Sequence, residues 1–127
     1  MSTLAERIEA VERSYEFMLA YAAQGRRDES GGSGAEIRRS LTAAADALDG
    51  LGNAASEAVR ARTNAAAFDP FIAVVAQDAQ KAAAALRLVL ATRPITSQLV
   101  DNLNASIHLR ALLTDLFLVD ESLKGEG

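Results

Sequence analysis

Cysteine is absent from this chain of 127 residues. Its absence excludes disulfides, iron–sulfur clusters, thiolate zinc sites and thiol catalysis, and it fits a reducing compartment. A membrane span is also missing, because the longest apolar stretch, residues 71–90, is interrupted by Gln77, Asp78 and Lys81, among others. The polar start, residues 1–7, lacks the basic and apolar regions of a signal peptide. We therefore expect a soluble, cytoplasmic protein that does not interact with membranes.

An excess of positive charge is missing as well. The formal net charge is −4, and pairs such as Arg26–Arg27 and Arg38–Arg39 have acidic neighbours. Phosphate recognition needs lysine and arginine gathered on one surface. The composition therefore argues against nucleic acid as a partner. The richness in alanine and arginine is typical of GC-rich bacterial genomes.

No stretch alternates with the period of a β-strand, whereas apolar residues recur at helical steps of three and four. Half of the residues are hydrophobic, which is enough for the core of one domain. We predict an all-α, up-and-down four-helix bundle, with helices at about 3–24, 35–62, 70–92 and 97–123. Residues 26–34 (RRDESGGSG) contain no apolar side chain and are expected to form a flexible linker.

The expected helix boundaries rest on local signals. Thr3 and Glu6 have the spacing of a capping box. Asp69 followed by Pro70 is typical of a helix start, and Pro94 disfavours helix at the residue before it. Gly50 and Gly52 fall inside the second helix, but the apolar pattern keeps its phase across them. A single helix is therefore favoured, and a short break at residues 49–53 is the alternative.

The first and last helices carry more apolar surface than a bundle needs. Phe17 and Tyr21 point away from the main apolar row of the first helix. In the last helix the apolar side changes after about residue 108. The second set comprises Leu109, Leu112, Leu116, Val119 and Leu123. The helix could be central or kinked midway. Alternatively, this second set forms an interface with Phe17 and Tyr21, and we expect a homodimer or a contact with a protein partner.

The sequence gives little support for a catalytic or a metal site. His108 lacks companions at ligand spacing, so neither metal nor cofactor is expected. Histidine phosphotransfer domains are similar four-helix bundles, but the lysine–glycine that typically follows their reactive histidine is missing after His108. His108 shares a polar stripe with Ser97, Asp101, Asn104 and Asp115, which we interpret as an exposed helix face. The glutamates at positions 9, 12 and 16 resemble solvated pairs with neighbouring arginines.

One group of residues could hold a ligand. Arg110 lies between the two apolar sets of the last helix, where it must extend to solvent, pair with an acid or bind an anion. Ser106 lies one turn before it. Tyr15 and Phe117 supply aromatic surface, so the four residues form the candidate ligand site.

Two functions remain after these exclusions. In size, acidity and helical content the chain resembles small helical chaperones and adaptors of bacterial export and regulatory systems, although no motif carries this likeness. We expect a non-enzymatic interaction protein of this kind, acting through the first and last helices. The alternative is a binder of a small apolar or amphipathic ligand in the bundle core, and an enzyme using Arg110 or His108 is the third hypothesis.

Overall fold

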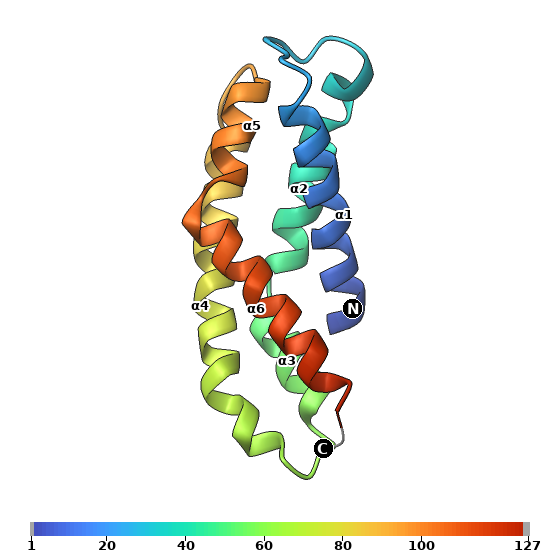
Figure 1. Ribbon diagram of the computed structural model, residues 1–127, viewed down its shortest axis with the longest axis vertical. Helices are drawn as coiled ribbons and strands as arrows, with labels where there is room; N and C mark the ends of the chain where they lie inside the picture. Colours follow the sequence, from blue (N-terminus) through green and yellow to red (C-terminus); the bar gives the residue numbers. More distant parts are fainter. Residues whose placement is uncertain (1, 126–127) are drawn as a thin grey trace.

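The computed structural model describes residues 2–125, and within that range it contains helices and no strand (Figure 1). The elements in chain order are α1 (Leu4–Ala22), the 3-10 turn η1 (Gly32–Ala35), α2 (Ile37–Leu48), α3 (Leu51–Val59), α4 (Ala65–Leu90), α5 (Ser97–Asn104) and α6 (Ile107–Leu123). The expected all-α class is confirmed. The expected number of helices is wrong, because the described residues form six α-helices instead of four.

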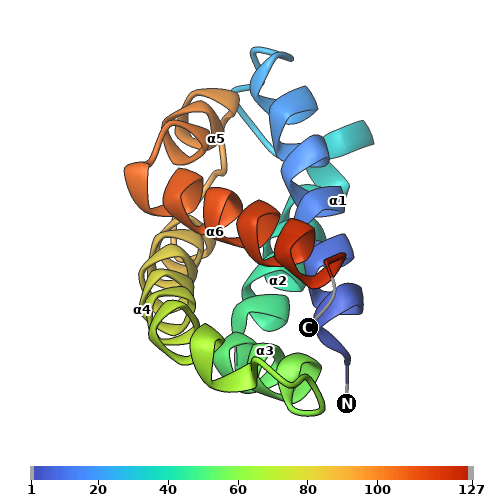
Figure 2. The ribbon, with the colours of Figure 1, turned by 60° about the horizontal axis from the view of Figure 1, so that its bottom comes forward.

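The six helices follow an up-and-down path with two of its four legs broken (Figures 1 and 2). The legs are α1, α2 with α3, the long α4, and α5 with α6. The last helix of the chain, α6, crosses the bundle obliquely, as the view in Figure 2 shows. Every α-helix contributes buried apolar side chains to one hydrophobic core.

The second leg breaks at Asp49 and Gly50. Asp49 has an extended backbone and Gly50 a φ of 74°, which favours glycine because a Cβ atom is strained there. The single helix over 35–62 is therefore wrong, and the alternative of a short break is correct. Gly52 serves a different purpose: a Cβ at this position would lie 2.8 Å from the Cβ of Ala76, so glycine lets α3 approach α4.

The fourth leg breaks between Ala105 and Ser106. Ser106 is extended (ψ 128°), and the expected continuous helix over 97–123 is therefore wrong. This break explains the change of apolar side in the sequence, because α6 starts in a new direction and turns its own apolar set to the core. The kinked alternative describes this leg correctly.

The start of α4 also differs from the prediction. The helix begins at Ala65, five residues before the expected start, and Pro70 lies inside it. Pro70 lacks the N–H that would bond to the carbonyl of Ala66, which costs one hydrogen bond. The three alanines at 65–67 are strong helix formers and precede this defect. Asp69 and Pro70 therefore lie within a helix, but they do not mark its start.

The capping box of α1 is confirmed. The N–H of Glu6 donates to Thr3 Oγ1 at 3.2 Å, and the N–H of Thr3 donates to Glu6 Oε1 at 2.9 Å. Local sequence therefore determines where α1 begins.

Three helix ends are capped by arginines from other parts of the chain. The last carbonyls of a helix lack partners within it and carry partial negative charge, so a guanidinium there is stabilising. Arg7 donates to the carbonyls of Ala47 and Asp49 at the end of α2. Arg38 donates to the carbonyls of Leu90 (2.7 Å) and Thr92 (2.8 Å) at the end of α4. Arg62 donates to the carbonyls of Leu123 (3.2 Å) and Gly125 (2.5 Å) at the end of α6.

Residues 26–34, expected to be flexible, are held by polar contacts. Glu29 accepts from both the Nε and the Nη2 of Arg38, at 2.8 and 3.0 Å, and from the N–H of Ile95 at 2.6 Å. The N–H of Arg26 donates to Ser97 Oγ at 2.8 Å, and the N–H of Ser97 donates to the carbonyl of Arg26 at 2.9 Å. The expectation considered only the missing apolar side chains, whereas charged and backbone groups attach this segment to the start of α5.

Candidate binding cleft

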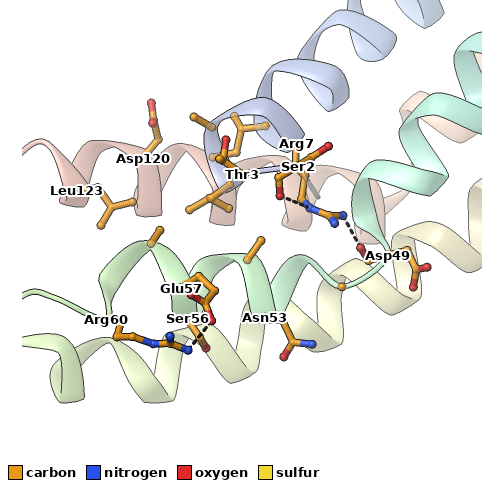
Figure 3. A pocket seen from close by; sticks show the side chains of 16 residues that line it. Ser2, Thr3, Arg7, Asp49, Asn53, Ser56, Glu57, Arg60, Asp120 and Leu123 are labelled. Atoms are coloured by element: carbon orange, nitrogen blue, oxygen red, sulfur yellow. Dashed lines mark hydrogen bonds and ion pairs between the residues drawn. The ribbon is translucent and has the colours of Figure 1, made fainter.

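A cleft of about 1080 Å³ opens between the start of α1, α3 and the end of α6 (Figure 3). It lies away from residues 26–34, in the half of the molecule that contains α3 (Figure 1). The residues that line it are Ser2, Thr3, Leu4, Ala5, Arg7, Ile8, Asp49, Gly50, Asn53, Ala54, Ser56, Glu57, Ala58, Arg60, Asp120 and Leu123.

The sequence leaves this space open for two reasons. First, α1 packs extensively against α2 but only lightly against α3, because the break at Gly50 gives α3 a new direction. Second, several of the facing side chains are short, such as those of Ala5, Ala54 and Ala58. Short side chains cannot fill the gap between diverging helices, so the gap persists as a cleft.

The cleft combines an apolar floor with a charged rim. Leu4 and Ile8 of α1 are buried beneath it, and Leu123 points from α6 towards α3 (Figure 3). Each of these side chains belongs to the core or packs against it. Such a floor favours an apolar surface of a ligand.

Arginine and carboxylate side chains form the rim. The guanidinium of Arg7 is oriented by the carbonyls of Ser2 and Ala47, and Arg60 pairs with Glu57 on α3. Asp120 of α6 and Asp49 after α2 supply two more carboxylates. Because both signs of charge occur around an apolar floor, the cleft suits an amphipathic ligand better than a simple ion.

The four residues of the predicted ligand site do not line this cleft. Ser106, Arg110 and Phe117 share one side of α6 by their spacing, and the side chains of Arg110 and Phe117 are exposed. Tyr15 lies half-buried on α1. Their role as ligand contacts stays a prediction.

Most of the residues predicted as an interface belong to the core. Tyr21, Leu109, Leu112, Leu116 and Val119 are buried within the single chain. In this fold they cannot meet a partner unless their helix undocks. The physical reason is the break at Ser106, which turns the second apolar set of the last leg inwards. Phe17 is half-buried and stacks on Tyr21, with ring centroids 6.4 Å apart.

The polar stripe on the last leg was also misplaced. Ser97, Asn104 and Asp115 are buried, whereas Asp101 and His108 are exposed as expected. Ser97 Oγ donates to the carbonyl of Tyr21 at 2.6 Å, and Asn104 Nδ2 donates to the carbonyl of Met18 at 3.2 Å. The hydrogen bonds of Ser97 and Asn104 join α5 to α1. They also offset the cost of burying these two polar side chains.

Asp115 is the functional candidate that sequence reasoning missed. Asp115 is 8% exposed, and its Oδ2 atom has no hydrogen-bond partner among the described residues. Burial first of all, and then the negative charge of Asp78 on α4, raises the pKa of Asp115 to about 7. A signal was present, since Asp115 directly precedes Leu116 and follows Leu112 and Leu113 within the apolar set of this helix.

Residues 2–125 contain neither a metal-binding cluster nor a membrane-spanning helix. No group of three or more His, Cys, Asp or Glu side chains in this range could hold a metal ion. No helix in the same part of the chain is long and apolar enough to cross a membrane. A scan against protein-family models finds no matching family, and searches of curated proteins and of solved structures find no significant match.

Proposed function

We propose that this protein is a non-enzymatic helical binding module, an adaptor or regulator that holds an amphipathic segment of a protein partner. The observation that carries this proposal is the cleft of about 1080 Å³, whose floor is apolar and whose rim is charged. Two of its three walls come from α1 and α6, which belong to the first and last legs of the bundle.

The position of the cleft between helices supports a protein segment as the ligand. Its volume of about 1080 Å³ lies at the upper end of the roughly 300–1,000 Å³ that is common for small-molecule pockets, so the volume alone fits either kind of ligand. Amphipathic helices bind in grooves between helices by placing their apolar face on the floor and their polar face towards solvent. The arginines and carboxylates at the rim would orient such a segment.

A small amphipathic molecule in the same cleft is the second candidate. The buried side chains of Leu4 and Ile8 would contact its apolar part, and Arg7 would face a polar or anionic end. The two candidates share the binding site and differ in the size of the ligand.

Substitution of Ala58 by tryptophan tests the cleft itself. Ala58→Trp places a large side chain in the cleft, whereas Ala84→Trp adds the same side chain on an exposed position of α4. The probe is the amphipathic fluorophore 8-anilinonaphthalene-1-sulfonate, titrated by fluorescence. We expect one saturable site that Ala58→Trp weakens about tenfold and Ala84→Trp leaves unchanged. Equal binding by both variants would contradict the proposal.

Photocrosslinking separates a protein segment from a small molecule. A photoreactive amino acid at position 58 should yield discrete crosslinks to one protein in cells, and the same group at position 84 should not. If position 58 gives no protein crosslink while a small molecule copurifies with the protein and is displaced by the fluorophore, the second candidate is correct.

We further propose that the protein is a cytoplasmic homodimer that pairs through the outer face of α6. Ile107 and Leu118 are exposed and lie on the same side of this helix, three turns apart, and exposed Phe117 adjoins them. Light scattering after size exclusion, over a hundredfold range of concentration, tests this proposal. A dimer that Phe117→Glu dissociates would support it, and a monomer at all concentrations would refute it.

A further inference from the structure

The charged rim of the cleft has an excess of carboxylates. The charged side chains that line the cleft are those of Arg7, Asp49, Glu57, Arg60 and Asp120. The rim therefore contains two guanidinium groups and three carboxylates, which gives it a net charge of −1. The net charge of the whole chain has the same sign, at −4. A ligand in the cleft thus meets a negative rim around an apolar floor.

Both arginines of the rim have partners within the chain. Arg60 pairs with Glu57 on α3. Arg7 donates from its Nη1 to the carbonyl of Ala47 at 3.1 Å and to the carbonyl of Asp49. Because the last carbonyls of a helix carry partial negative charge, they hold the positive charge of Arg7 at the end of α2. The positive charge of the rim is therefore engaged within the chain before a ligand binds.

Two carboxylates of the rim are left without a cation. Asp49 and Asp120 are exposed, and neither forms an ion pair within residues 2–125. One directly follows α2, and the other lies near the end of α6. Figure 3 shows them at opposite sides of the view, with Thr3 and Arg7 between them. Uncompensated negative charge therefore lies on two sides of the cleft.

We propose that the segment held in the cleft is a basic amphipathic helix of a protein partner, whose lysine or arginine side chains pair with Asp49 and Asp120. This inference rests on the proposed function, because it names the chemistry of the segment that the cleft holds. Amphipathic helices bind in such grooves through apolar residues that are three and four positions apart. Basic side chains beside this apolar row extend to the rim, while their stems cover apolar surface.

Charge complementarity favours this segment over other occupants. An acidic helix or an anionic small molecule would bring negative charge close to two carboxylates that have no cation, and like charges at an interface disfavour a complex. An uncharged segment would cover the floor formed by Leu4 and Ile8 but would gain nothing from the rim. A basic amphipathic helix uses both parts of the cleft, and the negative charge of the whole chain also favours its approach.

Two matched peptides test the sign of the charge. Each has about 15 residues, enough for a helix to form on binding, and the same apolar face. The polar face carries lysine in one peptide and glutamate in the other, and fluorescence anisotropy at pH 7 gives both dissociation constants. We expect the lysine peptide to bind at least about tenfold more tightly at low salt, and to lose most of this advantage at about 0.5 M salt. Equal affinities, a preference for the glutamate peptide, or binding of neither would overturn the proposal.

Removal of the two carboxylates tests whether this preference arises at the rim. Asp49→Asn combined with Asp120→Asn should weaken the lysine peptide by about threefold to tenfold, because each exposed pair contributes only modestly. The control combines Glu16→Gln with Asp101→Asn, which removes two exposed charges that do not line the cleft. It should change the affinity by less than about twofold, because salt screens distant charges. Equal losses in the two variants would show that the peptide follows the overall charge of the protein, and would overturn the proposal.

The anionic fluorophore 8-anilinonaphthalene-1-sulfonate separates a charge effect from damage to the cleft. The variant that combines Asp49→Asn with Asp120→Asn should bind the fluorophore as well as wild type or more tightly, because two like charges are gone. A distorted floor would instead weaken the fluorophore and the lysine peptide together. Parallel loss of both ligands would therefore overturn the pairing with Asp49 and Asp120.

Failure of this inference and failure of the proposed function give different results. Ala58→Trp fills the cleft whatever the charge of the ligand, and Ala84→Trp is its control. If Ala58→Trp weakens the fluorophore but the two peptides bind alike, the cleft is a binding site and the basic partner is wrong. If Ala58→Trp and Ala84→Trp bind the fluorophore equally, the proposed function itself fails.

Discussion

The carboxylate of Glu29 is partly buried and that of Asp115 is buried, but their surroundings are opposite. Glu29 accepts two hydrogen bonds from Arg38 and one from the N–H of Ile95, and its pKa is lowered by Arg38 first of all. The pKa of Asp115 is raised, by its burial first and by the negative charge of Asp78 on α4 second. The difference shows that burial stabilises the ionised form of a carboxylate only where a cation and N–H donors replace water.

The two regions therefore respond to pH in opposite directions. Glu29 contributes to the stability of the fold above its unfolded pKa of 4.5. This contribution is lost as the pH falls through the lower pKa of the folded state. Asp115 contributes to the stability of the fold below about pH 4, where it is protonated in both the folded and the unfolded chain. This contribution is lost as the pH rises through about 7. The end of the bundle closed by residues 26–34 is thus held firmly at neutral pH, whereas the contact between α4 and α6 is weakened there.

The largest expected loss of folding stability comes from adding a buried carboxylate that has no partner. Leu116→Glu places a charge at a site that is 1% exposed, whereas Phe117→Glu changes a neighbour that is 56% exposed. We expect Leu116→Glu to cost about 4 kcal/mol or more, because an unpaired buried charge adds to lost packing. Phe117→Glu should change the stability of the monomer by less than about 1 kcal/mol.

Urea unfolding followed by circular dichroism compares the two variants at pH 7. A folded Leu116→Glu protein with near wild-type stability would contradict the position of this side chain in the core. Unfolding of Phe117→Glu would contradict the exposed position of its neighbour.

Removing the partner of Glu29 should have the next largest effect. Arg38→Met deletes the guanidinium that binds Glu29 and caps α4 through the carbonyls of Leu90 and Thr92. We expect a loss of about 2–4 kcal/mol, since a partly buried carboxylate and two carbonyls lose their donor. The measurement is the urea midpoint at pH 7.

Arg39→Met is the matched control for this substitution. Arg39 pairs with Glu36 on the surface, with about 71% of its side chain exposed, so the loss should stay below about 0.5 kcal/mol. Equal costs for the two variants would show that the end near Glu29 is no more firmly held than a surface ion pair.

The smallest expected effect has the opposite sign. Asp115→Asn removes the need to ionise a buried carboxyl, so the variant should be more stable than wild type at pH 8, by about 1–3 kcal/mol. At pH 4.5, where Asp115 keeps its proton, the two proteins should differ much less. Urea unfolding at both pH values gives the comparison, and a variant less stable than wild type at pH 8 would contradict the unfavourable burial of this carboxyl.

Local signals in the sequence predicted much of the helical structure. The capping box of Thr3 and Glu6 is one of them, because it depends on residues three positions apart. The start of α5 has a local cap of the same kind, in which Thr96 Oγ1 accepts from the N–H of Leu99 at 3.1 Å. The break at Gly50 was recognised only as an alternative, because the apolar phase runs through it. The cleft was not predicted, because it depends on how three separate helices diverge.

The sequence by itself determined the all-α class, the capping at the start of α1 and the regions that form the four legs, because helical periodicity and capping act over a few residues. Only the tertiary structure decided which apolar face of α6 is buried, which helix ends receive arginines, and that Asp115 is buried. These outcomes depend on the direction that each segment takes after Gly50 and Ser106. Two backbone dihedral angles at such a residue re-aim a whole helix, and local composition does not specify where the helix then packs.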